Sequence, residues 1–167
     1  TPPDLAAYGR MLAQKFAGRR EKLLLEPGRS LVGNAGLLLT RVEYLKPGED
    51  KNFAIVDAAM NDLMRPALYE AYHGIVAVNE RKTSAKRYDI VGPICETGDF
   101  LGFARDLSIE EGDLLALLSA GAYGMSMASN YNSRPRAAEV LIDKNEIHLV
   151  HERETIEGMM SGERLVY

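Results

Sequence analysis

Residues 37–57 read LLLTRVEYLKPGEDKNFAIVD, and the character of the sequence changes where this stretch begins, after Gly36. Leu37–Tyr44 and Asn52–Asp57 are short runs of the kind that forms strands. Between them, Lys46-Pro47-Gly48 supplies the residue types that favour a tight turn. The stretch therefore predicts two strands with a turn between them.

The same pattern continues toward the end of the chain. Four further short strands are expected over Gly74–Val78, Tyr88–Val91, Phe100–Arg105 and Leu114–Leu118. Ala138–Ile142 and Glu146–Val150 alternate apolar and polar residues around Lys144-Asn145, which predicts a hairpin. A short helix is expected over Glu154–Met160. The pattern predicts a mainly β fold, with an antiparallel β-sandwich or barrel-like domain over residues 37–167.

Residues 1–36 have a different pattern. Pro2-Pro3-Asp4 precedes Leu5, Tyr8, Leu12 and Phe16, whose spacing predicts a helix that stops near Gly18. Leu23-Leu24-Leu25 is a continuous apolar run, typical of a strand buried on both faces of a parallel sheet. A helix followed by such a strand resembles the end of an α/β unit. We expect the α/β part to be truncated at its front.

Composition limits the function classes. The chain has 167 residues, 46% of them hydrophobic and 26% charged, which is typical of one globular domain. Its net charge of −4 argues against a general nucleic-acid binder, which usually carries a basic patch. A single Cys excludes an intramolecular disulfide and favours a reducing compartment. We therefore expect a cytoplasmic protein.

Glu26-Pro27-Gly28-Arg29-Ser30 follows the apolar run directly. In α/β folds, ligands bind beyond the carboxyl ends of parallel strands. The N–H groups of residues 28–30 are expected to form a small anion cradle, and Arg29 adds a guanidinium that suits carboxylate or phosphate. A plain turn with a surface Arg explains the same residues equally well.

Two later segments each carry a tyrosine in a position that suits contact with a ligand. Arg65 and Tyr69 are four residues apart, so in a helical turn they share a face and together suit a carboxylate. Tyr123 stands among small residues in Ser119–Gly124, which lets a ligand approach the ring and hydroxyl. The alternatives are a solvated Arg stacked on Tyr69 and an ordinary half-buried Tyr123.

The only Cys, Cys95, lies in a polar loop next to Glu96. Acidic neighbours disfavour a thiolate, so Cys95 suits a proton donor better than a nucleophile. A buried Cys that acts as a small hydrophobic residue is the alternative. Common zinc and phosphate-loop motifs are absent, the His residues are scattered and expected to be structural or solvated, and Arg134-Pro135-Arg136 is expected at the surface.

Five segments, taken in order, resemble the C-terminal portion of the diaminopimelate decarboxylases. These belong to the pyridoxal-phosphate decarboxylases of the alanine-racemase-like fold. The segments are Glu26-Pro27-Gly28-Arg29, Met64-Arg65-Pro66-Ala67-Leu68-Tyr69, Cys95-Glu96-Thr97-Gly98-Asp99, Ala120-Gly121-Ala122-Tyr123-Gly124 and Asn132-Ser133-Arg134-Pro135. The first is shared with ornithine and arginine decarboxylases, whereas the second and third indicate the diaminopimelate branch.

The resemblance implies a β/α barrel followed by a C-terminal β domain. Residues 1–36 would be the last helix and strand of the barrel, and residues 37–167 the β domain. Pyridoxal 5'-phosphate would be the cofactor, contacted by Glu26, Pro27, Gly28, Arg29 and Tyr123.

The resemblance also implies a substrate and a partner. Meso-diaminopimelate, or the product L-lysine, would be bound by Arg29, Arg65, Tyr69, Glu96 and Tyr123. Cys95 would donate the proton. The enzyme would be a homodimer in which Cys95 and Glu96 reach into the partner subunit's site.

One part of the family pattern is missing. The Schiff-base Lys of the family lies early in its barrel, and no Lys of this sequence has that context. The chain is therefore expected to be part of a longer decarboxylase and inactive alone. Two alternatives remain, namely a related decarboxylase acting on ornithine or arginine and a non-catalytic homologue that serves as a dimerisation module. The presence of Arg29, Cys95 and Glu96 argues against the second.

Overall fold

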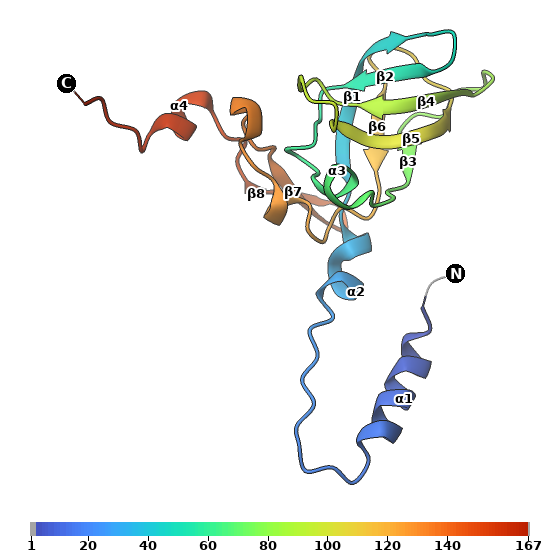
Figure 1. Cartoon of the computed structure of the whole chain (residues 1–167), viewed down its shortest axis with the longest axis vertical. Helices are drawn as coiled ribbons and strands as arrows, with labels where there is room; N and C mark the ends of the chain where they lie inside the picture. The colour runs from blue at the N-terminus through green and yellow to red at the C-terminus, as the bar shows by residue number, and fades with distance from the viewer. Residues whose placement is uncertain (1–2, 167) are drawn as a thin grey trace.

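Six strands of the computed structural model, which describes residues 3–166, form one sheet in the order β3-β6-β1-β2-β4-β5 (Figure 1). The strands are β1 (Leu38–Lys46), β2 (Asn52–Val56), β3 (Ile75–Ala77), β4 (Lys86–Val91), β5 (Phe100–Leu107) and β6 (Leu114–Leu117). All six were predicted, with ends displaced by at most a few residues. The mainly β fold is confirmed.

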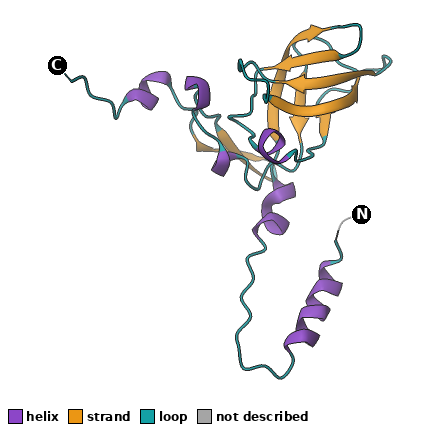
Figure 2. Ribbon diagram, in the orientation of Figure 1, coloured by secondary structure: helices purple, strands orange, loops and turns teal. Residues whose placement is uncertain are grey.

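The sheet is strongly curved and resembles a barrel (Figure 2). Its two terminal strands approach each other, since Ile75 Cδ1 on β3 lies 2.8 Å from where a Cβ on Gly102 of β5 would stand. Four strand pairs are antiparallel as expected, but β2 and β4 are parallel. The connection between them contains α3 (Arg65–Tyr69) and β3 and brings the chain back to run in the same direction. Hydrophobic alternation has the same period in both directions, so it does not reveal this pairing.

The core fills the inside of this curved sheet. Its fully buried side chains include Val42, Val56, Ile90, Leu101 and Leu115. Each comes from a different strand, so every strand of this sheet except β3 supplies a residue with no exposed surface. Burial of one such side chain contributes roughly 1.5–3 kcal/mol.

The N-terminal helix α1 (Leu5–Phe16) forms as predicted. Asp4 caps it, because its Oδ1 accepts from the Ala7 N–H at 2.9 Å, and Gly18 follows with φ of 75°. The predicted strand over Leu23–Leu25 is wrong, since these residues are irregular and exposed. No strand of the described residues lies beside them, so their backbone lacks the ladder partner that a strand requires. A short helix, α2 (Gly28–Val32), follows instead.

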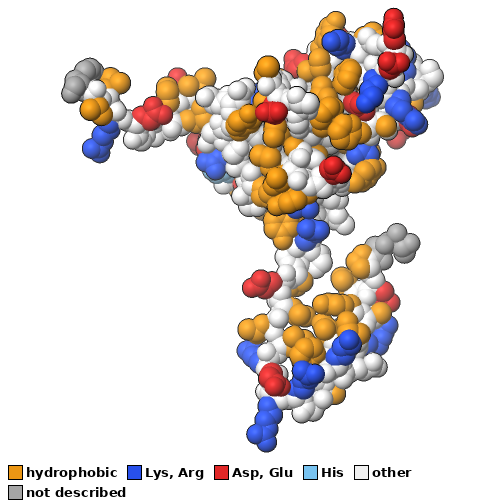
Figure 3. Space-filling view, viewed as in Figure 1, with side chains coloured by type: hydrophobic (Ala, Val, Ile, Leu, Met, Phe, Trp, Pro, Cys, Tyr) orange, Lys and Arg blue, Asp and Glu red, His pale blue; other side chains and the backbone are white. Residues whose placement is uncertain are grey.

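The predicted hairpin is also confirmed, as β7 (Glu139–Asp143) and β8 (Glu146–His151). Lys144 in its tight turn has φ of 56°, as such turns require. The last helix, α4 (Ile156–Met160), is capped by Thr155 and begins two residues later than expected. Every residue of the hairpin is exposed. Figure 3 shows hydrophobic side chains on the open surface of both the α1 region and the sheet domain.

Among residues 3–166, no helix has the length and apolar character that crossing a membrane requires.

Candidate functional site

The segment before β1 and the loop after β6 cross where the chain enters and leaves the sheet. The Ala120 N–H donates to the Gly36 carbonyl at 2.9 Å, and the Gly121 N–H donates to the Gly33 carbonyl at 3.1 Å. A Cβ on Gly121 would lie 2.0 Å from the carbonyl oxygen of Val32. The crossing therefore requires glycine at position 121, and it ties α2 to the loop that follows β6.

This crossing brings Arg29 onto Tyr123. The Arg29 Cζ lies 5.5 Å from the centroid of the Tyr123 ring, within cation–π range. Tyr123 itself has φ of 61°, an unusual backbone conformation for a residue with a side chain, and its side chain is half exposed. Without the close contact at Gly121, the two segments would not bring Arg29 and Tyr123 together.

Helix α3 adds a second arginine and a second tyrosine. The Arg65 Cζ lies 5.4 Å from the Tyr69 ring centroid, as their four-residue spacing predicts. The same Cζ lies 5.3 Å from the Tyr123 ring centroid. Tyr123 is thus contacted by both guanidinium groups, and the four side chains form one continuous stack.

The stack lines an open cavity of about 340 Å³ at the surface, which Met127 also lines. Two guanidinium groups that share one ring repel each other, and an anion between them relieves this repulsion. Arginine also presents its N–H donors in a fork that matches carboxylate or phosphate. The arrangement therefore suits an anionic ligand with a phosphate or a carboxylate.

The backbone before Arg29 differs from the expected cradle of three amides. The Ser30 N–H donates to the Pro27 carbonyl at 2.9 Å and is unavailable to a ligand. Gly28 and Arg29 open α2, so their N–H groups have no partner within the helix. No atom lies within 4 Å of where a Cβ on Gly28 would stand. Glu26 is exposed in the irregular segment just before. Of the three amides predicted to form the cradle, those of Gly28 and Arg29 remain available, with open space beside Gly28.

Cys95 and Glu96 lie elsewhere, in the turn between β4 and β5. The Cys95 thiol is free and exposed, so the alternative of a buried Cys is wrong. Glu96 Oε2 accepts from the hydroxyl of Tyr131 at 3.3 Å. The negative charge of Glu96 raises the pKa of Tyr131 above its usual value. Neither Cys95 nor Glu96 lines the cavity of the arginine–tyrosine stack.

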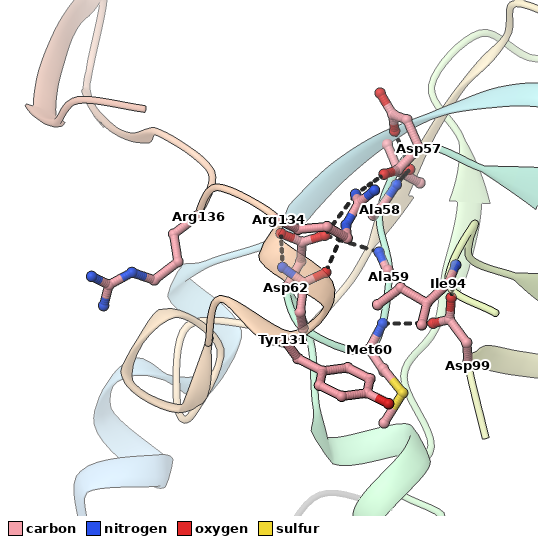
Figure 4. A network of polar contacts seen from close by, with 12 residues as sticks. Asp57, Ala58, Ala59, Met60, Asp62, Ile94, Asp99, Tyr131, Arg134 and Arg136 are labelled. Carbon is pink, nitrogen blue, oxygen red and sulfur yellow. Dashed lines mark hydrogen bonds and ion pairs between the residues drawn. The ribbon is translucent and has the colours of Figure 1, made fainter. Parts of the chain in front are cut away.

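Arg134 lies in the surface segment that was predicted, with 29% of its side chain exposed, but its guanidinium turns inward. The Arg134 Nε donates to Asn61 Oδ1 at 2.9 Å, and its Nη2 donates to the Asp57 carbonyl at 2.6 Å (Figure 4). Asn61 is fully buried. Arg136, by contrast, points away from this network in Figure 4 and pairs with Glu154. Sequence reasoning missed the network because its members are far apart in the chain.

His73 lines a smaller cavity next to the stack, together with Arg29 and Arg65. His73 is buried, and its Nδ1 lies 2.9 Å from the Leu118 carbonyl oxygen, which fits the expected structural role. Over residues 3–166, no three His, Cys, Asp or Glu residues are grouped so that they could hold a metal ion.

Comparison with known proteins adds independent information. The family model described as "Pyridoxal-dependent decarboxylase, C-terminal sheet domain" matches residues 13–121. The chain is 64% identical over 161 residues to a diaminopimelate decarboxylase of Neisseria meningitidis, covering 96% of this chain and 40% of the relative. It is 59% identical to one from Pseudomonas aeruginosa, covering 99% of this chain and 40% of that protein.

Solved structures show the same fold. A crystal structure of a protein from Aquifex aeolicus matches with a TM-score of 0.92 and 46% identity, covering 96% of this chain and 40% of that one. The diaminopimelate decarboxylase of Helicobacter pylori complexed with L-lysine matches with a TM-score of 0.87 and 38% identity, over 95% of this chain and 39% of that one.

The chain spans about 40% of the length of the curated relatives above. The family match covers well over half of this chain, and it includes the stack residues Arg29, Arg65 and Tyr69 as well as the Cys95–Glu96 turn. The chain therefore belongs to the pyridoxal-dependent decarboxylase family, of which it contains the C-terminal sheet domain.

Proposed function

We propose that this chain is the C-terminal part of a pyridoxal-phosphate-dependent diaminopimelate decarboxylase. The enzyme converts meso-2,6-diaminopimelate to L-lysine and carbon dioxide in lysine biosynthesis. The observation that carries this proposal is the stack of Arg29, Tyr123, Arg65 and Tyr69 around one cavity. The names of the relatives and the L-lysine in the Helicobacter pylori structure support the choice of substrate.

The residues beside the cavity fit the cofactor. The N–H groups of Gly28 and Arg29 suit a phosphate dianion, and the hydroxyl of the half-exposed Tyr123 adds a further donor. Glu26 and Pro27 set the backbone direction at the start of α2. When bound, the pyridoxal ring supplies an acceptor for the electrons left behind as carbon dioxide departs.

Substrate choice follows from charge. The far end of diaminopimelate carries a carboxylate, for which Arg29 and Arg65 provide guanidinium donors beside Tyr69. Its ammonium group suits Glu96. Lysine and ornithine lack that distal carboxylate and would leave the arginines without a partner, at a cost of roughly 1–3 kcal/mol for each lost partner.

Cys95 is the proton donor in this proposal. Its thiol is exposed, which a proton donor to a bound substrate requires. Because neither Cys95 nor Glu96 lines the arginine–tyrosine cavity, we infer that they serve the site of a partner subunit in a homodimer. Residues 1–36 would then pack within a barrel domain. A free exposed thiol also fits the reducing cytoplasm.

The test is release of carbon dioxide, with lysine as the second product from diaminopimelate, by the full-length enzyme with added pyridoxal phosphate. Meso-diaminopimelate, ornithine, arginine and lysine are offered in parallel, and we expect turnover of diaminopimelate alone. Turnover of ornithine or arginine instead would support the related decarboxylase. If the cofactor binds and no substrate is consumed, the chain belongs to a non-catalytic homologue. The 167-residue chain by itself is expected to release no lysine.

Replacing Arg65 by Lys tests the substrate contact. Lysine keeps the positive charge and loses the forked donors, so we expect KM for diaminopimelate to rise about tenfold. The matched control is Arg87→Lys, at an exposed arginine that pairs with Asp106 across β4 and β5. Equal KM values for the two variants would remove Arg65 from the substrate site.

A further inference from the structure

The turn that carries Cys95 and Glu96 is held by a buried carboxylate. Asp99, at the end of this turn, has only 4% of its surface exposed. Its Oδ2 accepts from the Ile94 N–H at 2.8 Å, directly before Cys95. Its Oδ1 accepts from the Met60 N–H at 2.7 Å, in the loop after β2. One side chain therefore fixes the start of the turn and joins it to a second loop (Figure 4).

The backbone of the turn folds around this carboxylate. The Gly92 N–H donates to the Asp99 carbonyl at 3.1 Å, and the Asp99 N–H donates to the Glu96 carbonyl at 3.0 Å. A Cβ on Gly92 would lie 2.3 Å from Asp99 Oδ2. Glycine at 92 is thus needed for the carboxylate to enter the turn. Burial raises the pKa of Asp99, which its two backbone donors partly oppose.

A second contact reaches the side chain of Glu96. The Tyr131 hydroxyl donates to Glu96 Oε2 at 3.3 Å, a longer bond than those of Asp99. Tyr131 lies three residues before Arg134, whose guanidinium bonds to Asn61 and to the Asp57 carbonyl. The loop after β2, to which Met60 also belongs, therefore anchors both contacts.

We infer that Asp99 and Tyr131 are positioning residues that hold the Cys95–Glu96 turn from two sides. Asp99 fixes the backbone and so the direction of the Cys95 thiol, whereas Tyr131 fixes the carboxylate of Glu96. The inference rests on the proposed function for its catalytic consequence, because the turn would carry the proton donor and the ammonium-binding group. Its structural part stands on the contacts alone.

The test uses the full-length protein and four variants. Asp99→Asn keeps the size of the side chain but turns an N–H toward one backbone donor. Tyr131→Phe removes only a hydroxyl, at a position that is half exposed. The first control is Asp89→Asn, at a buried carboxylate that accepts from the Ala104 N–H and pairs with Lys51 but does not contact the turn. The second is Tyr44→Phe, at an exposed tyrosine of β1.

Two measurements need no enzyme activity. Hydrogen exchange of the peptide that contains residues 92–99 is expected to be roughly tenfold faster in Asp99→Asn than in Asp89→Asn, because the turn has lost a backbone hydrogen bond. The rate at which iodoacetamide alkylates Cys95 should change severalfold in the same variant. Equal changes in Asp99→Asn and Asp89→Asn would show that Asp99 only stabilises the fold, and would overturn the inference.

Kinetics separates the two residues. In Asp99→Asn we expect kcat to fall about a hundredfold with cofactor binding unchanged, as a displaced proton donor produces. In Tyr131→Phe we expect KM to rise a few-fold with kcat nearly unchanged, since the Glu96 contact is long. KM values equal to that of Tyr44→Phe would overturn the role of Tyr131. If the unaltered enzyme releases no lysine, the proposed function fails, while exchange and alkylation still decide whether Asp99 holds the turn.

Discussion

The six-stranded sheet and the segments that flank it form their elements from the same local sequence patterns. Their apolar side chains nevertheless differ, being buried in the sheet and exposed in the flanking segments. In the sheet, alternating residues such as Val42 and Leu101 find partners within the chain and are fully buried. In the flanking segments, which are residues 5–32, the β7–β8 hairpin and α4, equally apolar residues such as Leu24 and Ile147 are each 75% exposed. Local pattern thus decides which element forms, and burial depends on what the rest of the chain provides.

The largest expected effect contrasts one apolar residue from each region. Leu101→Ala leaves a cavity in the core and should lower the free energy of unfolding by roughly 2–5 kcal/mol. Ile147→Ala, on the exposed hairpin, should change it by at most about 0.5 kcal/mol. Urea unfolding of the chain measures both. A cost at Ile147 equal to that at Leu101 would mean that the hairpin is packed in solution.

An intermediate effect is expected where the two regions join. Gly121→Ala places a methyl group against the Val32 carbonyl and should cost roughly 1–3 kcal/mol as the segments move apart. It should also separate Arg29 from Tyr123 and weaken binding of pyridoxal phosphate to the full-length enzyme. Fluorescence titration of the cofactor measures this. Gly162→Ala, where the added methyl group meets open space, is the matched control and should alter neither quantity.

The smallest expected effect depends on pH and has opposite signs in the two regions. Arg136 lowers the pKa of Glu154 to about 2 from its usual 4.5. The stability from this pair is therefore present above about pH 4.5 and lost as the pH falls toward 2. Burial instead raises the pKa values of Asp62 and Asp99. Protonation of these two carboxylates in acid therefore removes part of the free-energy cost of burying their charge.

Hydrogen exchange at successive pH values tests this contrast. The protection factor of the peptide with residues 136–154, which compares its exchange rate with that of the unfolded peptide at the same pH, should fall between pH 4.5 and 2 more than that of the peptide with residues 54–63. Glu154→Gln should remove the pH dependence of the first protection factor and leave the second unchanged. A parallel fall of both protection factors in the unaltered chain would contradict the assignment.

The strands were predictable because each of them combines a clear pattern with turn residues at its ends. Lys144-Asn145 marked its hairpin, and Pro47-Gly48 marked the end of β1. The strand expected over Leu23–Leu25 failed for a different reason. A strand requires a neighbour, and a run of three leucines carries no information about whether the chain supplies one.

The candidate site was predictable in parts. The four-residue spacing placed Arg65 and Tyr69 on one helical face, and the structure has them in contact. The approach of Arg29 to Tyr123 depends on the crossing at Gly121, which no local pattern predicts. Asp99 did leave a signal, since an Asp that follows a Gly in a polar loop is a frequent acceptor of backbone N–H groups. Tyr131 and Arg134 left none, because their partners lie far away in the sequence.

The parallel pairing of β2 with β4 has a consequence for the order of folding. The antiparallel neighbours β1 and β2 are joined by a short turn and can pair early, whereas β2 and β4 meet only after the whole connection between Val56 and Lys86 has closed. That connection contains α3, and with it Arg65 and Tyr69. The arginine–tyrosine stack is therefore among the last parts of the domain to form, and a chain caught midway would have much of its sheet before Arg29, Arg65 and Tyr123 had come together.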